Sequence, residues 1–152
     1  MEKRSIDHRF RLLGLAELAD YPKPPIKNDV IAKSRAYVLK FVHPNGAIHS
    51  PSQNQGKENL CTAVAVCALA KVGDPKDAEI IAKALTYLAD QQLKKGSSTK
   101  LIPFPVTPES PLFGGLCKDA RAEHTPDIYT TLWLLKALDA ASERNIAVAA
   151  TL

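Results

Sequence analysis

The stretch GGLCKDARAEHTPDIYTTLWLLKAL, residues 114–138, joins a polar loop to a helical pattern that carries almost no charge. Thr125, Pro126 and Asp127 have the residue types that begin helices: a capping side chain, a proline in the first turn and an acid at the positive end of the helix dipole. From there to about Ser142, apolar residues lie on nearly every face. The stretch therefore predicts a helix that is buried on most of its sides.

Similar patterns precede this one along the chain. Apolar residues that recur every three to four positions predict helices over about 7–20, 30–41, 59–72 and 75–93. Gly73 ends the third of these helices, and Asp74 and Pro75 begin the fourth at once. About thirty residues then follow without helical periodicity and contain four prolines: Pro103, Pro105, Pro108 and Pro111. We therefore expect an all-α chain with about five helices and one long proline-rich loop.

Composition places the chain among ordinary folded proteins. Its 152 residues are 45% hydrophobic and 24% charged, enough for one domain with a buried core. The uncharged run over 60–70 is much shorter than the ~20 residues that span a bilayer, and the first residues lack the apolar centre of a signal peptide. The odd number of cysteines, three, argues against a disulfide framework. We expect a cytoplasmic protein that is not transmembrane.

The balance of charge is mildly basic. Lys and Arg outnumber Asp and Glu by 20 to 16, which gives a formal net charge of +4. A basic cluster lies near the start of the chain, but no aromatic residues alternate with it and no nucleic-acid-binding motif contains it. We therefore expect no nucleic-acid partner.

An internal repeat organises the helices. Residues 31–37 (IAKSRAY) match residues 81–87 (IAKALTY) at an offset of 50, and 59–70 (NLCTAVAVCALA) match 127–138 (DIYTTLWLLKAL) at an offset of 68. Each unit is an outer helix, a loop and a more apolar inner helix, and such units bury their faces by stacking. The expected division is residues 1–29, an N-terminal helix with a proline-rich linker, and residues 30–152, two helix-loop-helix repeats.

The second repeat carries a resemblance to a known superfamily. Gly114-Gly115-Leu116, a short polar loop and then Asp127, Tyr129 and Thr131 form a pattern that resembles the repeat of the α/α toroid superfamily. That superfamily includes the protein prenyltransferase β subunits and the squalene-hopene and other terpenoid cyclases. A weaker copy consists of Asn45-Gly46-Ala47-Ile48, Asn59 and Thr62. The resemblance covers residues 30–142 and implies a partial α/α toroid of helical hairpins.

The chemistry of those enzymes does not carry over residue by residue. The prenyltransferase zinc site resembles an Asp-x-Cys pair plus a histidine between the Tyr and Thr of the motif. Here that position is Thr130, and the chain contains no Asp-x-Cys. The Asp-x-Asp-Asp and DDxxD motifs are absent as well, and Asp74 and Asp77 are better explained as a helix cap. The sequence therefore predicts no catalytic, cofactor-binding or metal-binding residues, and no cofactor.

Two groups of side chains stay as candidates for a site. Tyr37, Tyr129, Thr130 and Trp133 are candidates for the lining of an apolar cavity or an interface. A weaker candidate is the polar cluster of Cys117, Asp119 and His124, whose spacing matches no known zinc finger and which lacks an orienting group for covalent catalysis. We interpret these three as loop residues that are exposed or bonded locally.

The number of helices then suggests a function. A closed toroid needs roughly twice as many helix pairs as this chain supplies, so its inner helices need a cover from outside. Candidate covers are other protein subunits, self-association or an apolar isoprenoid ligand. We expect a non-catalytic helical subunit or interaction module. The alternative is part of an isoprenoid-handling enzyme, completed by another chain, in which Tyr37, Tyr129 and Trp133 form aromatic walls.

Overall fold

The structure is a computed structural model that describes residues 28–51, 56–98, 103–120 and 125–147. Over these residues it contains four α-helices and one short 3-10 helix, and no strand: α2 (Asn28–Leu39), α3 (Glu58–Val72), η1 (Pro75–Asp77), α4 (Ala78–Gln91) and α5 (Ile128–Ser142). The expectation of an all-α chain is confirmed for this part. The helix expected over 7–20 lies outside the described residues. The division expected at residue 29 is not tested by them.

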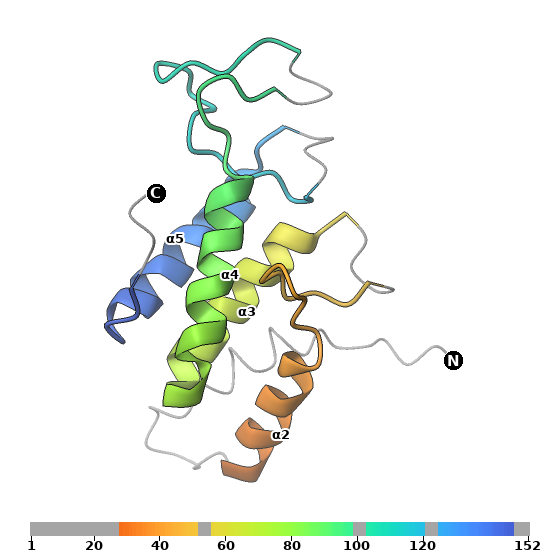
Figure 1. The fold of residues 1–152 in the computed structure, drawn as a ribbon, viewed down its shortest axis with the longest axis vertical. Coiled ribbons are helices and arrows are strands. Elements are labelled where there is room, and N and C mark those ends of the chain that lie inside the picture. The colour runs from red at the N-terminus through yellow and green to blue at the C-terminus, as the bar shows by residue number, and fades with distance from the viewer. Residues whose placement is uncertain (1–27, 52–55, 99–102, 121–124, 148–152) are drawn as a thin grey trace.

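Helix α3 is the centre of the packing. Figure 1 shows α4 and α5 lying alongside it, and α3 has its most extensive contacts with α5 and then with α4, whereas α2 contacts it over a smaller area. All residues from Cys61 to Ala70 are buried. Alanine, valine and cysteine dominate this run, and their short side chains let neighbouring helices approach closely from several sides. The nearly uncharged sequence of α3 therefore corresponds to a helix enclosed by its neighbours.

The helix ends follow the sequence signals with two corrections: the helix expected over 75–93 is divided into η1 and α4, and the cap of α5 is a different residue. Gly73 ends α3 with a left-handed φ of 71°, and its N–H donates to the Leu69 carbonyl. The Asp74 side chain accepts from the Lys76 N–H at the start of η1. Thr125, however, does not cap α5: Asp127 is the extended N-cap residue, and its carboxylate accepts from the Thr130 N–H at 2.9 Å. Aspartate accepts this bond with a full charge, so the helix begins after it.

The two hairpins close with corresponding hydrogen bonds. In the first, the His43 N–H donates to the Ala47 carbonyl at 2.8 Å; in the second, the Leu93 N–H donates to the Gly115 carbonyl at 3.0 Å. The donors are 50 residues apart and the acceptors 68 apart, the same offsets that relate the sequences. The turn after each outer helix is thus built in the same way in both hairpins.

The hairpins also share the way in which each loop joins its inner helix. Ile48 and Leu116, which again differ by 68, are both fully buried. The Ile48 N–H donates to Thr62 Oγ1 at 2.9 Å, and the Leu116 N–H donates to Thr131 Oγ1 at 3.1 Å. The second threonine lies one residue further along its helix than the sequence alignment places it. Each hydroxyl in turn donates to a carbonyl one turn earlier, so a helix start holds the loop in both cases.

The long loop is anchored at the end of α4. Leu93, Val106 and Cys117 form a small buried cluster, separate from the main core, against which Leu112 packs. The Gly96 N–H donates to the Val106 carbonyl at 2.9 Å, and the Val106 N–H donates to the Ser97 carbonyl at 2.8 Å. The described portion of the loop, 103–120, contains no helix, as the sequence predicts.

Candidate functional site

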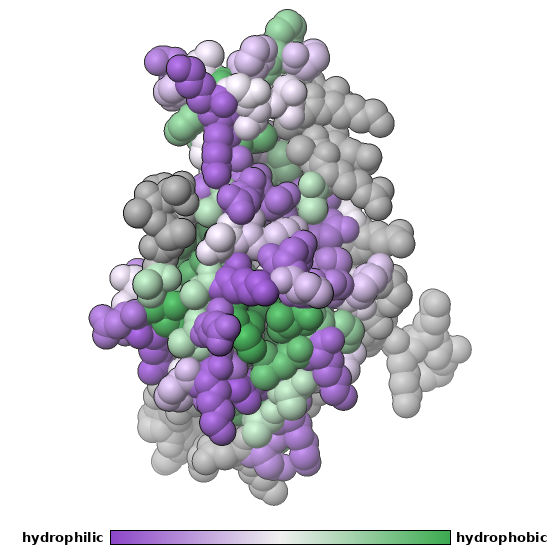
Figure 2. Space-filling view, viewed as in Figure 1, coloured by the Kyte–Doolittle hydropathy of each residue, from purple (hydrophilic) through white to green (hydrophobic). Residues whose placement is uncertain are grey.

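Helix α5 leaves a row of large apolar side chains uncovered. Ile128, Tyr129, Leu132 and Leu135 are exposed over 88%, 47%, 47% and 57% of their surface, respectively. Because residues three and four apart lie on one side of a helix, Ile128, Leu132 and Leu135 form a single stripe. We call these four residues the α5 stripe. Figure 2 shows apolar surface over α5, and a further apolar area between α4 and α2.

The opposite face of α5 belongs to the core. Leu134, Ala137 and Ala141 are almost fully buried, and Trp133 is also buried. Helix α5 thus carries large apolar residues on both faces, and the described part of the chain covers only one of them. Such surplus apolar surface on a folded protein is typical of an interaction site.

Three of the residues predicted for a cavity or an interface lie together on α5. The rings of Tyr129 and Trp133 meet edge to face with centroids 6.2 Å apart, and Lys136 Nζ lies 4.8 Å from the Trp133 centroid. Tyr129 is part of the exposed stripe, whereas Trp133 is mostly covered. The positive Lys136 ammonium already occupies a face of the indole ring in a cation–π contact.

Thr130 serves the start of α5 rather than an open surface. It is fully buried, and its hydroxyl donates to the Asp127 carboxylate at 2.5 Å. Burial alone would raise the pKa of Asp127, but the hydrogen bonds from Thr130 and the charge of Lys118 hold that pKa below its ordinary value. Thr130 and Asp127 thus form one capping unit.

Tyr37 lies on a different element from the other three. It is on α2, where its ring meets Phe41 edge to face at 5.1 Å, and Lys40 Nζ lies 6.0 Å from its centroid. Helix α2 packs on α3, and it has no extensive contact with α5. The described structure therefore does not bring Tyr37 together with Tyr129 and Trp133.

Cys117 and Asp119 are buried in the loop before α5. Burial first, and then the nearby Asp119 carboxylate, raises the pKa of the Cys117 thiol, which favours the protonated and less nucleophilic form. Within the described residues no group of three or more His, Cys, Asp and Glu side chains is placed to hold a metal ion. His124, the third member of the predicted cluster, lies outside those residues.

A buried polar junction holds this loop. Its central residue, Asn59, was not among the site residues predicted from the sequence. The Asn59 side-chain amide donates to the carbonyls of Cys117 at 3.0 Å and Asp119 at 2.8 Å. Its carbonyl oxygen accepts from the Tyr87 hydroxyl at 2.9 Å. One asparagine thus joins α3, α4 and the loop that leads into α5. The sequence signal that could have identified Asn59 is its position as a single amide side chain at the start of the otherwise largely apolar run 60–70.

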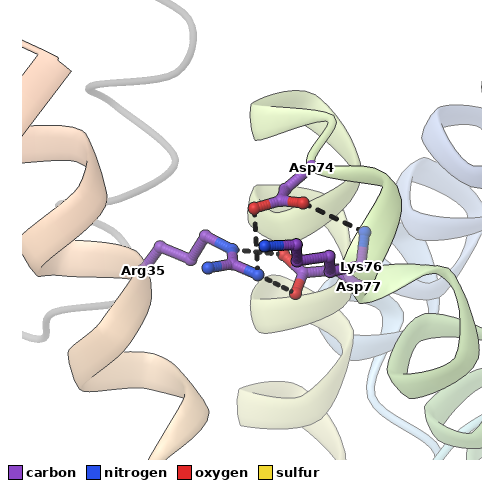
Figure 3. Close-up of polar contacts among 4 residues, drawn as sticks. All are labelled: Arg35, Asp74, Lys76 and Asp77. Carbon is purple, nitrogen blue, oxygen red and sulfur yellow. Dashed lines mark hydrogen bonds and ion pairs between the residues drawn. The ribbon is translucent and has the colours of Figure 1, made fainter.

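A second missed interaction joins α2 to the following hairpin. Figure 3 shows Arg35 reaching from α2 to Asp77 and Asp74 at the turn before α4. Arg35 Nε and Nη2 donate to the two carboxylate oxygens of Asp77 at 2.6 Å and 2.5 Å, and Nη2 lies 3.1 Å from Asp74. The hydrogen bond to Asp77 is the main reason that the pKa of Arg35 is raised. Asp74 does cap η1, but the buried Asp77 carboxylate binds Arg35 instead of capping a helix.

Comparison with known proteins adds no assignment. No family model, characterised protein or solved structure is significantly similar to this chain. In the described part of the chain, no helix combines the length and the apolar character that a membrane span requires.

Proposed function

We propose that this protein is a non-catalytic helical subunit that binds a protein partner through the α5 stripe. The observation that carries the proposal is the exposure of Ile128, Tyr129, Leu132 and Leu135 on a helix whose other face lies in the core. Burial of apolar surface contributes roughly 25 cal/mol per Å², so covering these side chains favours association.

The surroundings of the stripe support docking of a partner. Helix α5 is fixed by the core on its inner face, by the Asp127 cap at its start and by Arg144 after its end, whose Nε donates to the Ala70 carbonyl of α3 at 3.1 Å. A rigid helix loses little conformational entropy when a partner binds to it. The stripe is therefore a preorganised surface.

The second candidate function is part of an isoprenoid-handling enzyme, as the resemblance to the α/α toroid superfamily implies. The aromatic pair Tyr129 and Trp133 on α5 is the observation in its favour. Against it, Lys136 occupies a face of Trp133, and Tyr37 stands on a helix that does not pack with α5. An apolar ligand on the stripe would appear in an organic-solvent extract of the purified protein.

The test compares complexes purified gently from the native source, with every component identified and the total mass measured. We expect the wild-type chain in an assembly, and we expect the double variant Leu132→Glu/Leu135→Glu to be released from it. Both residues are exposed, so the variant keeps its helical circular dichroism spectrum. Phe104→Ser, which changes a residue 74% exposed on the long loop, is the matched control and stays assembled. A wild-type chain that is a lone monomer in these preparations and stays monomeric at high concentration would contradict the proposal.

A further inference from the structure

The internal repeat indicates what kind of surface the α5 stripe is. At the offset of 68, Tyr129, Leu132 and Leu135 correspond to Cys61, Val64 and Cys67 of α3. Those three α3 residues are 4%, 1% and 4% exposed. The same face of the inner helix is therefore covered in the first hairpin and uncovered in the second.

The chain itself shows what kind of element packs against an inner helix. Helix α3 has its most extensive contacts with α5, the corresponding inner helix of the next hairpin. Two inner helices of this sequence thus pack side by side within one molecule. The open side of α5 continues that interface, and it suits another apolar helix of the same kind.

We propose that this helix is α5 of a second copy of the chain. Among the described helices, α3 is enclosed within its own molecule, and the large exposed apolar residues on a helix are all on α5. A second copy offers its own α5 stripe as such a helix face, which gives a two-fold contact of identical surfaces. This proposal rests on the docking role of the stripe and names the partner.

The charges of α5 permit this pairing. Its fifteen residues include one base, Lys136, and one acid, Asp139, and no other charge. Two copies therefore meet without an excess of like charge, in contrast to helices with a charged outer face. A stable interface buries about 800 Å² on each partner, more than four side chains of one helix supply, so the dimer is weak and depends on concentration.

The first measurement is sedimentation equilibrium of the full chain over a wide range of concentration. We expect the wild type to pass reversibly from monomer to dimer as the concentration rises. Leu132→Glu/Leu135→Glu dimerises at least tenfold more weakly, because two acidic faces repel, whereas Phe104→Ser behaves as the wild type. A wild type that stays monomeric throughout would overturn the proposal of a second copy.

Charge exchange tests whether the stripe meets its own copy. Leu132→Lys/Leu135→Lys, like the glutamate variant, is expected to be monomeric alone, and an equimolar mixture of the two variants is expected to dimerise again. A mixture that stays monomeric, although the wild type dimerises, would place the contact elsewhere and overturn the proposal.

These experiments also distinguish the second-copy proposal from the proposed docking role of the α5 stripe, on which it rests. If the wild type is monomeric but a different protein binds it and is lost with Leu132→Glu/Leu135→Glu, then the stripe is a docking surface for that protein and the second-copy proposal is wrong. A monomer that binds no protein and yields an isoprenoid on extraction contradicts both.

Discussion

At the scale of the residue, the polar groups that matter most are buried. Asn59 satisfies two loop carbonyls and the Tyr87 hydroxyl at once, in a place where water cannot replace it. A buried group that loses its partner costs more than a hydrogen bond contributes, because its desolvation is no longer compensated. The Asn59 amide is therefore one of the main anchors of the loop that positions α5.

Replacement of Asn59 by alanine is expected to lower the free energy of unfolding by about 3 kcal/mol, since three buried groups lose their partner at roughly 1–3 kcal/mol each with partial relaxation. Tyr87→Phe, which removes one hydroxyl and keeps the ring, is expected to cost about 1 kcal/mol. Urea denaturation measures both values. Equal losses in the two variants would show that Asn59 does not hold the loop.

The same junction makes stability depend on alkaline pH. Burial first, and then the charges of Glu58 and Asp119, raises the pKa of Tyr87 from 10.0 to about 12. Between these values the unfolded chain has lost a proton that the folded chain keeps, so the free energy of unfolding falls as pH rises. The contribution of Tyr87 is complete below pH 10 and is lost as pH passes about 12. Urea denaturation across this range is expected to give a shallower fall for Tyr87→Phe than for the wild type; parallel curves would contradict the shift.

At the scale of the element, α2 is, among the described helices, the one with the least contact to the core. Its contact with α3 is small, and Arg35 forms an ion pair with the buried Asp77 carboxylate. Helix α2 contributes one fully buried residue, Val38, to the main hydrophobic cluster, whereas α3, α4 and α5 each contribute several. Removal of the arginine leaves a buried carboxylate without its counter-charge.

Arg35→Ala is expected to destabilise the protein by roughly 2–3 kcal/mol, less than the roughly 3–5 kcal/mol for breaking a fully buried pair, because Arg35 is itself partly exposed. Hydrogen exchange should show the loss first in α2. Lys33→Ala is the control: it breaks an exposed pair with Asp29 on the same helix and should cost under about 0.5 kcal/mol. If the two variants lose the same stability, Arg35 does not anchor α2.

At the scale of the whole molecule, the described structure has two hydrophobic clusters of unequal size. The larger is built around α3, and the smaller holds the long loop against the end of α4. Regions with few buried apolar contacts open at a lower free energy than the main core. The reactivity of the cysteine thiols can measure this difference in opening free energy, because Cys61 and Cys67 lie in α3 whereas Cys117 lies in the loop cluster.

Alkylation of the native protein, mapped by mass spectrometry, is therefore expected to modify Cys117 first, at least roughly tenfold faster than the α3 cysteines, which corresponds to an opening that costs about 1.4 kcal/mol less. The raised pKa of Cys117 works against this order, so a faster reaction reports opening and not thiol chemistry. In urea all three cysteines should react alike. Equal rates in the native protein would show that loop and core open together.

Local signals in the sequence predicted most of the described helix ends, but not the contacts between residues that are far apart in the chain. The boundaries of α3, the Gly73 end and the Asp74 cap follow from residue types that act within one turn. Thr125 was assigned the cap that Asp127 provides, since both are capping residues and only the backbone geometry selects one. Arg35 could not be paired with Asp77 in advance, because the two residues lie 42 positions apart and no local pattern records the contact.

The sequence by itself determined that the described part of the chain is helical, most of the places where its helices begin and end, and two hairpins related by offsets of 50 and 68, because caps, prolines and apolar periodicity act over short distances. Only the tertiary structure decided which apolar residues are covered. Val64 and Leu132 occupy matching positions in equally apolar helices, yet α3 is enclosed by its neighbours and α5 is not. Burial depends on what lies beside a helix in space, and no pattern within the helix records it.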